Sequence, residues 1–285
     1  CNLNVIGLGS AGCGIADKLV QYPQYNVYKI DVGLRGLKKD GIYAMPKQKS
    51  VEAYESNCPS MKNFFKNVTG EVLFIVCGAG KISGATLRIL ETIKNCQISI
   101  LYVLPDIELL SEIAQLRNKI GYNILQEYAR SGLLERLHIV HNPAVESLIG
   151  SVPIVGYYEK LNEVIAYTMH MINVFKNTTP VMNTFSQPVD FARISTFGTF
   201  DEAEKKENLF FPLDNIRERV YYYGVPSETL ESDGNLLKSI TEQVKSSSDK
   251  GKIKSSFGIF PTEYDQGYCF TEVHTSFIQN IKKSS

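Results

Sequence analysis

The chain lacks an excess of charge of either sign, because its 30 lysine and arginine residues balance its 30 aspartate and glutamate residues. It therefore lacks the basic footprint with which proteins bind nucleic acid. It also lacks any apolar run near the roughly 20 residues that cross a bilayer. Its first residues have the pattern of a strand rather than of a signal peptide. We therefore expect a protein of the cytoplasm that binds neither nucleic acid nor a membrane directly.

Cysteine is scarce and scattered. The six cysteines are Cys1, Cys13, Cys58, Cys77, Cys96 and Cys269. They form no CxxC pair and no cysteine–histidine spacing that is typical of zinc. In a chain of 285 residues, this pattern predicts reduced thiols, no disulfide framework and no metal site.

Glycine, by contrast, is concentrated in two short turns, each of which follows an apolar run of strand character. The first turn, residues 7–14, follows Leu3 to Ile6, and the second, residues 78–84, follows Glu71 to Cys77. Each opens onto a helix-like stretch. Glycine lets the backbone come close to a ligand, and the free N–H groups at a helix start favour an anion. The two turns together predict a phosphorylated ligand that is held from both sides, with a nucleotide as the natural candidate.

Strand-like and helix-like segments alternate through the first half of the chain. The predicted strands are 3–8, 25–30, 71–77, 98–104 and 136–141, and the predicted helices are about 11–22, 83–95 and 108–131. Several of the strands are nearly continuous apolar runs, as buried parallel strands require. This order predicts an α/β fold with a doubly wound, mostly parallel sheet. Its ligand should bind at the carboxyl ends of the strands.

One long helix separates this half from the rest. Between Tyr157 and Lys176, apolar residues recur at spacings of three and four, which predicts a core helix with one apolar stripe. We therefore divide the chain into a nucleotide-binding domain (1–155), a central helix (156–178) and a smaller α+β C-terminal domain (179–285).

Within the C-terminal domain, strands are predicted at 214–225 and 252–278, with a helix near 234–247. Residues 200–208 are rich in charge and are predicted to form a solvated surface loop.

The first turn by itself also matches a dinucleotide fingerprint. Gly7, Gly9 and Gly12 have its spacing, and Asp31 stands at the end of the second strand, where such proteins have an acid that binds ribose. An NAD-dependent oxidoreductase with a Rossmann domain is therefore one interpretation. The four histidines are dispersed, however, and no set for hydride transfer is visible.

Later residues favour a different family. The segment Tyr158-Glu159-Lys160-Leu161-Asn162 resembles the Tyr-x-x-Leu-Asn segment that opens the central helix of tubulins, and His141-Asn142-Pro143 resembles the loop that contacts guanine. Residues four apart share a helical face, and an amide offers both a donor and an acceptor. Residues 257–260 and 268–273 resemble the last, hairpin-like strand pair of the same family. From the first strand to about residue 278, the chain resembles the tubulin/FtsZ superfamily.

This resemblance implies a site for GTP or GDP, with Mg²⁺ as an optional companion. The implied phosphate contacts come from both glycine turns, the base contacts from the central helix and the loop before it, and the ribose contact from the second strand. In order, these residues are Gly9, Ser10, Ala11, Gly12 and Cys13; Gly78, Ala79, Gly80, Lys81 and Ser83; Asn142, Tyr158 and Asn162; and Asp31.

The sequence departs from the family pattern at both ends of the site. In the second turn, Lys81 and Ile82 stand where the family has threonine and glycine. In the loop that completes the neighbouring subunit's site, Asp190 matches the first acid, but Arg193 replaces the second, catalytic one. A guanidinium cannot accept a proton from water. The resemblance therefore implies a GTPase whose hydrolysis is weak or absent, with Arg193 able to pair with phosphates across an interface.

The implied function is head-to-tail assembly of this chain with itself into a filament or ordered polymer, in a bacterial or phage-infected cytoplasm. A heterologous contact produces an open filament when its rotation does not close. Two other interpretations stay open. The chain could be a structural assembly component without nucleotide, or the oxidoreductase described above.

Overall fold

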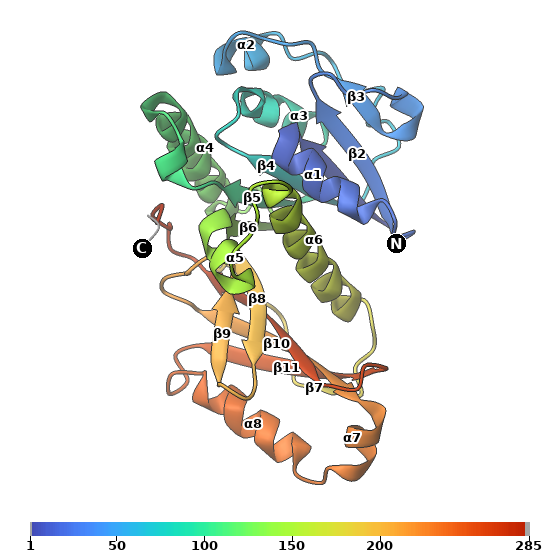
Figure 1. Cartoon of the computed structure of the whole chain (residues 1–285), viewed down its shortest axis with the longest axis vertical. Helices are drawn as coiled ribbons and strands as arrows, with labels where there is room; N and C mark the ends of the chain where they lie inside the picture. Colours follow the sequence, from blue (N-terminus) through green and yellow to red (C-terminus); the bar gives the residue numbers. More distant parts are fainter. Residues whose placement is uncertain (1, 283–285) are drawn as a thin grey trace.

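A computed structural model of the chain describes residues 2–282. Cys1 and residues 283–285, which the predicted domain division includes, lie outside the described residues. Figure 1 shows two parts at opposite ends of the long axis, with one long helix, α6 (Tyr157–Lys176), between them. None of the helices in the described range is long and apolar enough to cross a membrane.

The N-terminal part alternates strands and helices, as the sequence predicts. Its elements are β1 (Leu3–Leu8), α1 (Gly9–Leu19), β2 (Tyr25–Asp31), β3 (Ile42–Ala44), α2 (Val51–Ser56), β4 (Glu71–Cys77), α3 (Thr86–Thr92), β5 (Gln97–Leu104), α4 (Glu112–Arg130), β6 (Arg136–His141) and α5 (Asn142–Ile149). The 3-10 turns η1 (Lys38–Asp40), η2 (Lys81–Ala85) and η3 (Ile107–Leu109) lie among them. The strand order is β3-β2-β1-β4-β5-β6, and all these neighbours pair in parallel.

This order reverses direction between β1 and β4. In open α/β sheets, ligands bind in the crevice at such a switch point, outside the carboxyl ends of the strands. The two glycine turns follow these same two strands. The fold therefore brings together the two turns that the sequence singled out.

Helices cover both faces of this sheet. On one face, α1 and α6 pack with β1 and β4 around a buried cluster that includes Ile15, Leu161 and Ile165. On the other face, α3 and α4 bury Ile89 and Leu125 against the strands. The predicted stripe of α6 is buried at Leu161, Ile165, Thr168, Met169, Ile172 and Phe175. The central helix is therefore a core element, as its periodicity predicts.

The C-terminal part continues the same sheet rather than forming a separate one. Its elements are β7 (Met182–Asn183), β8 (Ile194–Asp201), β9 (Lys206–Leu209), β10 (Glu218–Pro226), α7 (Ser227–Ser232), α8 (Leu236–Ser246), β11 (Lys254–Thr262) and β12 (Tyr268–Thr275). β8 pairs with β6 in parallel through Leu137–Ile194 and His138–Ser195. Beyond β8 the order is β12-β10-β11-β7, with β9 on β8.

Two expectations for this part are wrong. The last two strands do not form a hairpin, because β10 lies between them, antiparallel to β12 and parallel to β11. Residues 200–208 are not a plain loop either. They turn between β8 and β9, whose antiparallel pairing joins Asp201 to Lys206. Among residues 2–282, β9 pairs with β8 alone, so its charged residues can remain in solvent while its backbone pairs.

Candidate functional site

The first glycine turn lies where β1 ends and α1 begins. Leu8 closes the strand and Gly9 opens the helix, so the backbone changes direction within one residue, at a φ of 76° for Gly9. Glycine adopts a positive φ without the usual steric cost. The first four N–H groups of the helix, from Gly9 to Gly12, have no partner within it. They give this end of α1 the capacity to attract an anion.

Two more glycines allow α1 to lie directly on the sheet. A Cβ on Gly12 would lie 2.4 Å from the carbonyl oxygen of Ile75 in β4, and one on Gly7 would lie 2.4 Å from the carbonyl oxygen of Gly12. The buried Cys13 thiol donates to the carbonyl oxygens of Gly7 and Ile30, both at 3.4 Å. Burial raises the pKa of Cys13 to about 12. Its side chain therefore stays protonated and faces the strands, so only its backbone could contact a ligand.

The second turn holds itself together with its own side chains. The hydroxyl of Ser83 lies 2.6 Å from the carbonyl oxygen of Gly80 and 3.3 Å from that of Gly78. Lys81 Nζ donates to the carbonyl oxygen of Lys49, at 3.1 Å, in the loop between β3 and α2. The hydroxyl and the ammonium that the sequence offered to phosphate therefore both have partners within the chain.

Neighbouring elements hold the same turn from below. Arg117 of α4 donates to the carbonyl oxygen of Ala79 at 2.9 Å. Burial raises the pKa of the Cys77 thiol, and backbone hydrogen bonds from Ala79 and Gly80 to its sulfur act in the opposite direction. The turn is thus fixed from both sides.

The base-reading candidates lie at the start of two consecutive helices that contact each other, α5 and α6. Asn142 is the first residue of α5, and its Oδ1 is buried without a hydrogen-bond partner among the described residues. The Nε2 atom of the preceding residue, His141, is also buried without a hydrogen-bond partner among the described residues. Burial lowers the pKa of His141, so this ring is neutral. Unpaired buried polar atoms are rare and call for an explanation.

At the start of α6, Tyr157 and Tyr158 contact each other, and Tyr157 is fixed by a hydrogen bond. Tyr157 donates to Glu146 Oε2 at 2.5 Å, and its ring meets that of Tyr158 edge to face, with centroids 5.0 Å apart. The Tyr158 ring is 58% exposed and free to stack on a flat ligand. Tyr157, which the sequence analysis did not single out, therefore orients Tyr158. The sequence feature that could have revealed this role is Glu146, 11 residues earlier, but no local pattern pairs it with Tyr157.

Asn162 links the base end to the first glycine turn. A Cβ on Gly14 would lie 2.5 Å from Asn162 Nδ2, so the amide rests on the backbone of α1. Asp31, predicted to bind ribose, ends β2 and accepts a hydrogen bond from the backbone N–H of Val32 at 2.8 Å. Burial raises its pKa, and this hydrogen bond partly offsets the effect. The fold thus gathers these residues around the carboxyl ends of the strands.

The loop with the catalytic candidates lies at the other end of α6, a helix of 20 residues and so about 30 Å long. Arg193 Nε donates to the carbonyl oxygen of Asp190 at 2.9 Å, and its NH1 lies 3.2 Å from the carbonyl oxygen of Glu135. A salt bridge to the Glu135 carboxylate at 3.7 Å adds to this. The guanidinium of Arg193 therefore has hydrogen-bond and ion-pair partners within the same chain, while Asp190 is exposed.

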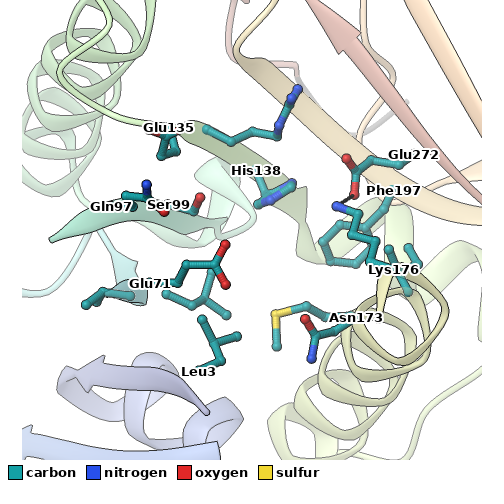
Figure 2. A pocket seen from close by; sticks show the side chains of 15 residues that line it. Leu3, Glu71, Gln97, Ser99, Glu135, His138, Asn173, Lys176, Phe197 and Glu272 are labelled. Carbon is teal, nitrogen blue, oxygen red and sulfur yellow. Dashed lines mark hydrogen bonds and ion pairs between the residues drawn. The ribbon is translucent and has the colours of Figure 1, made fainter. Parts of the chain in front are cut away.

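A cavity of about 270 Å³ lies at the amino ends of the same strands, beside the last turns of α6. Figure 2 shows Lys176 of α6 meeting Glu272 of β12 at its edge, with His138 of β6 nearby. Lys176 Nζ lies 2.7 Å from Glu272 Oε2, and His274 Nε2 lies 3.1 Å from Glu272 Oε1. Arg136 donates to His274 Nδ1 at 2.6 Å. Sequence reasoning missed this cluster because its members come from three distant segments.

The buried histidines of this cluster predict acid sensitivity. Burial lowers the pKa of His138 to about 3 and that of His274 to about 4. Below pH 6.5, the unfolded chain takes up protons that the folded chain refuses, so stability falls as pH falls from 6.5 toward 4. Each histidine should contribute about 1 kcal/mol per pH unit. Glu272 adds to this loss below about pH 4.5, because Lys176 and His274 outweigh the effect of burial and lower its pKa.

Chemical denaturation at pH 7.5, 6.5, 5.5 and 4.5 measures this slope. The variant His138→Leu should lose about 1 kcal/mol per pH unit of it, and the rest should remain because burial also lowers the pKa values of His141, His170 and His274. A slope that the variant leaves unchanged would show that His138 is not a source of the pH dependence.

Comparison with known proteins places the fold. No protein-family model and no curated protein matches the sequence. Solved structures do match. A GTPγS-form protofilament of Bacillus thuringiensis serovar israelensis TubZ superimposes with a TM-score of 0.73 at 15% identity, over 96% of this chain and 86% of that one. An empty FtsZ dimer from M. jannaschii gives 0.70 at 11%, over 96% and 87%. CetZ from Methanosaeta thermophila gives 0.70 at 14%, over 97% and 87%.

The chain has the tubulin/FtsZ fold. The likeness covers both parts of the molecule and the central helix, so the resemblance read from the sequence is confirmed for the fold. In this tubulin/FtsZ fold, the two glycine turns follow the neighbouring strands β1 and β4, the first turns of α6 pack on α1, and the loop with Asp190 lies beyond the other end of α6. No group of three or more His, Cys, Asp or Glu residues within 2–282 is arranged to hold a metal ion.

Proposed function

We propose that this chain is a guanine-nucleotide-binding protein that assembles head to tail with itself into filaments, and that it hydrolyses GTP weakly or not at all. The observation that carries the proposal is the separation of two half-sites by α6. Tyr158 and Asn162 lie in its first turns and Asn142 at the start of the neighbouring α5, whereas Asp190 lies beyond the other end of this helix of about 30 Å. One chain cannot bring both to the same nucleotide, but two chains stacked along the axis of α6 can.

Exposed apolar side chains at both ends support this stacking. Before α6, Ile154 and Val155 are 94% and 92% exposed. Beyond its end, Val181, Met182 and Phe191 are also exposed. Two different apolar patches at opposite ends suit a heterologous contact, which repeats without limit when it does not close into a ring. The TubZ structures that share the fold include a two-stranded and a four-stranded filament.

The state of the loop supports weak hydrolysis. Arg193 cannot act as a general base, and its hydrogen bonds to backbone carbonyls hold the loop in shape instead. Asp190 is then the one acid of the predicted pair left to orient water. To reach the neighbour's phosphates, as the sequence predicts, Arg193 would have to break these hydrogen bonds.

The test is to purify the protein, identify any nucleotide in the denatured supernatant by mass spectrometry, and measure sedimentation and phosphate release after adding GTP. We expect a guanine nucleotide, a pellet that grows above a threshold concentration, and phosphate release far below one turnover per minute. An adenine dinucleotide in the supernatant would instead support the oxidoreductase. A protein that stays monomeric at every concentration would overturn the assembly proposal.

A nucleotide-free structural component is the second candidate, and one observation favours it. The side chain of Ile82 lies against Gly9, between the two turns that would hold phosphate. Polymer that forms without any bound nucleotide, and that guanosine does not affect, would support this alternative.

A further inference from the structure

The isoleucine in the second glycine turn occupies the space between the two turns. A Cβ on Gly9 would lie only 2.9 Å from Ile82 Cγ2, and one on Gly80 would lie 4.0 Å from the same methyl group. The methyl group therefore touches the start of α1 from the side of the second turn. Gly9 in turn must remain glycine on two grounds, its φ of 76° and this contact.

The polar groups of the second turn cannot easily compensate for this methyl group. Ser83 is hydrogen-bonded within the turn, Lys81 donates to Lys49, and the N–H groups of Ala79 and Gly80 point at the sulfur of Cys77. An anion in this space would face hydrocarbon and would have to displace existing hydrogen bonds. Moving charge out of water without compensating donors is unfavourable. The first N–H groups of α1 have no partner within the helix and can still receive an anion.

We infer that Ile82 prevents the site from discriminating GTP from GDP by the terminal phosphate. This inference rests on the proposed guanine site and specifies its ligand. The base end and the start of α1 hold the base and the first phosphates, while Ile82 denies the terminal phosphate the second turn. GDP and GTP then bind with equal affinity, and the nucleotide is a structural cofactor rather than a timer for assembly.

The experiment titrates the folded chain with guanosine, GDP and GTP, each with and without Mg²⁺, by calorimetry. For the natural sequence, we expect the GDP and GTP dissociation constants to agree within threefold. The variant Ile82→Gly, which removes the methyl groups and restores the family's residue, should bind GTP at least tenfold more tightly and guanosine no differently. The matched control Ile82→Val keeps the branched Cβ and its Cγ2 methyl group, and should behave like the natural chain.

The outcomes separate this inference from the proposed function. Natural protein that binds GTP tenfold or more tightly than GDP overturns the inference and leaves the guanine site intact. The same holds if Ile82→Gly folds, as its thermal melt would show, and still binds the two nucleotides equally. Should that variant fail to fold, Ile82→Ala removes most of the side chain and carries the same expectation. Failure of guanosine, GDP and GTP to bind either protein would overturn the guanine site and this inference with it.

Discussion

Replacing Ile154 and Val155 by aspartate should abolish polymer formation while the monomer stays as stable as before. Both side chains are more than 90% exposed in the single chain, so folding loses nothing by their removal. In a head-to-tail contact they become buried, and burying one such side chain is worth about 1.5–3 kcal/mol. Losing two, and burying two carboxylates instead, should raise the threshold concentration for assembly more than 100-fold. Sedimentation across a concentration series measures the threshold, and a thermal melt confirms the fold.

The control is Val20→Asp, at the end of α1 opposite its glycine turn. Val20 is 56% exposed, so this change adds the same charge to another exposed aliphatic side chain. Its threshold should match that of the natural chain. If the control and the double variant lose assembly equally, general charge repulsion, rather than the end contact, drives the effect.

The heterologous geometry adds a sharper expectation. The double variant retains an intact loop end, with Phe191 exposed, so it can still bind one end of a growing filament. It should therefore stop growth at amounts well below those of the natural chain. A two-fold symmetric contact would give a different result, because a subunit with its one patch destroyed could not bind a filament at all.

Replacing Asn142 by leucine should weaken guanine binding by about 30- to 100-fold. The amide of Asn142 is 7% exposed, and its Oδ1 lacks a partner in the described structure. A buried acceptor without a partner costs about 1–3 kcal/mol, and a bonded base would relieve that cost. The free variant should thus be as stable as the natural chain or more so, because leucine removes the unpaired oxygen. Calorimetric titration with guanosine and denaturation of the free protein measure the two effects.

Opposite changes in binding and stability are the signature of a residue kept for its ligand. Asn177→Leu, an exposed position at the end of α6, is the matched control and should leave guanine binding unchanged. A variant at Asn142 that is destabilised and still binds guanosine normally would make the amide a structural residue of the α5 start.

The sequence was most informative where local chemistry decides the structure. The apolar runs, the two glycine turns and the helix over 157–176 depend on spacing within a few residues, and the structure has them as predicted. Strand pairing depends on distant segments instead, so nothing in 254–275 reveals that β10 lies between β11 and β12. The site shows the same division. The loss of glycine at Ile82 is visible in the sequence, but the direction of its side chain is not. The bonds of Arg193 across 58 residues to Glu135 are equally invisible there.

The ion pair between Lys176 and Glu272 fastens the last turn of α6 to β12, while Asn162 rests on α1 near its start. Separating a buried carboxylate from its partner costs several kcal/mol, far above thermal energy. Each subunit should therefore be rigid along α6, and a filament of such subunits should bend only at the contacts between them.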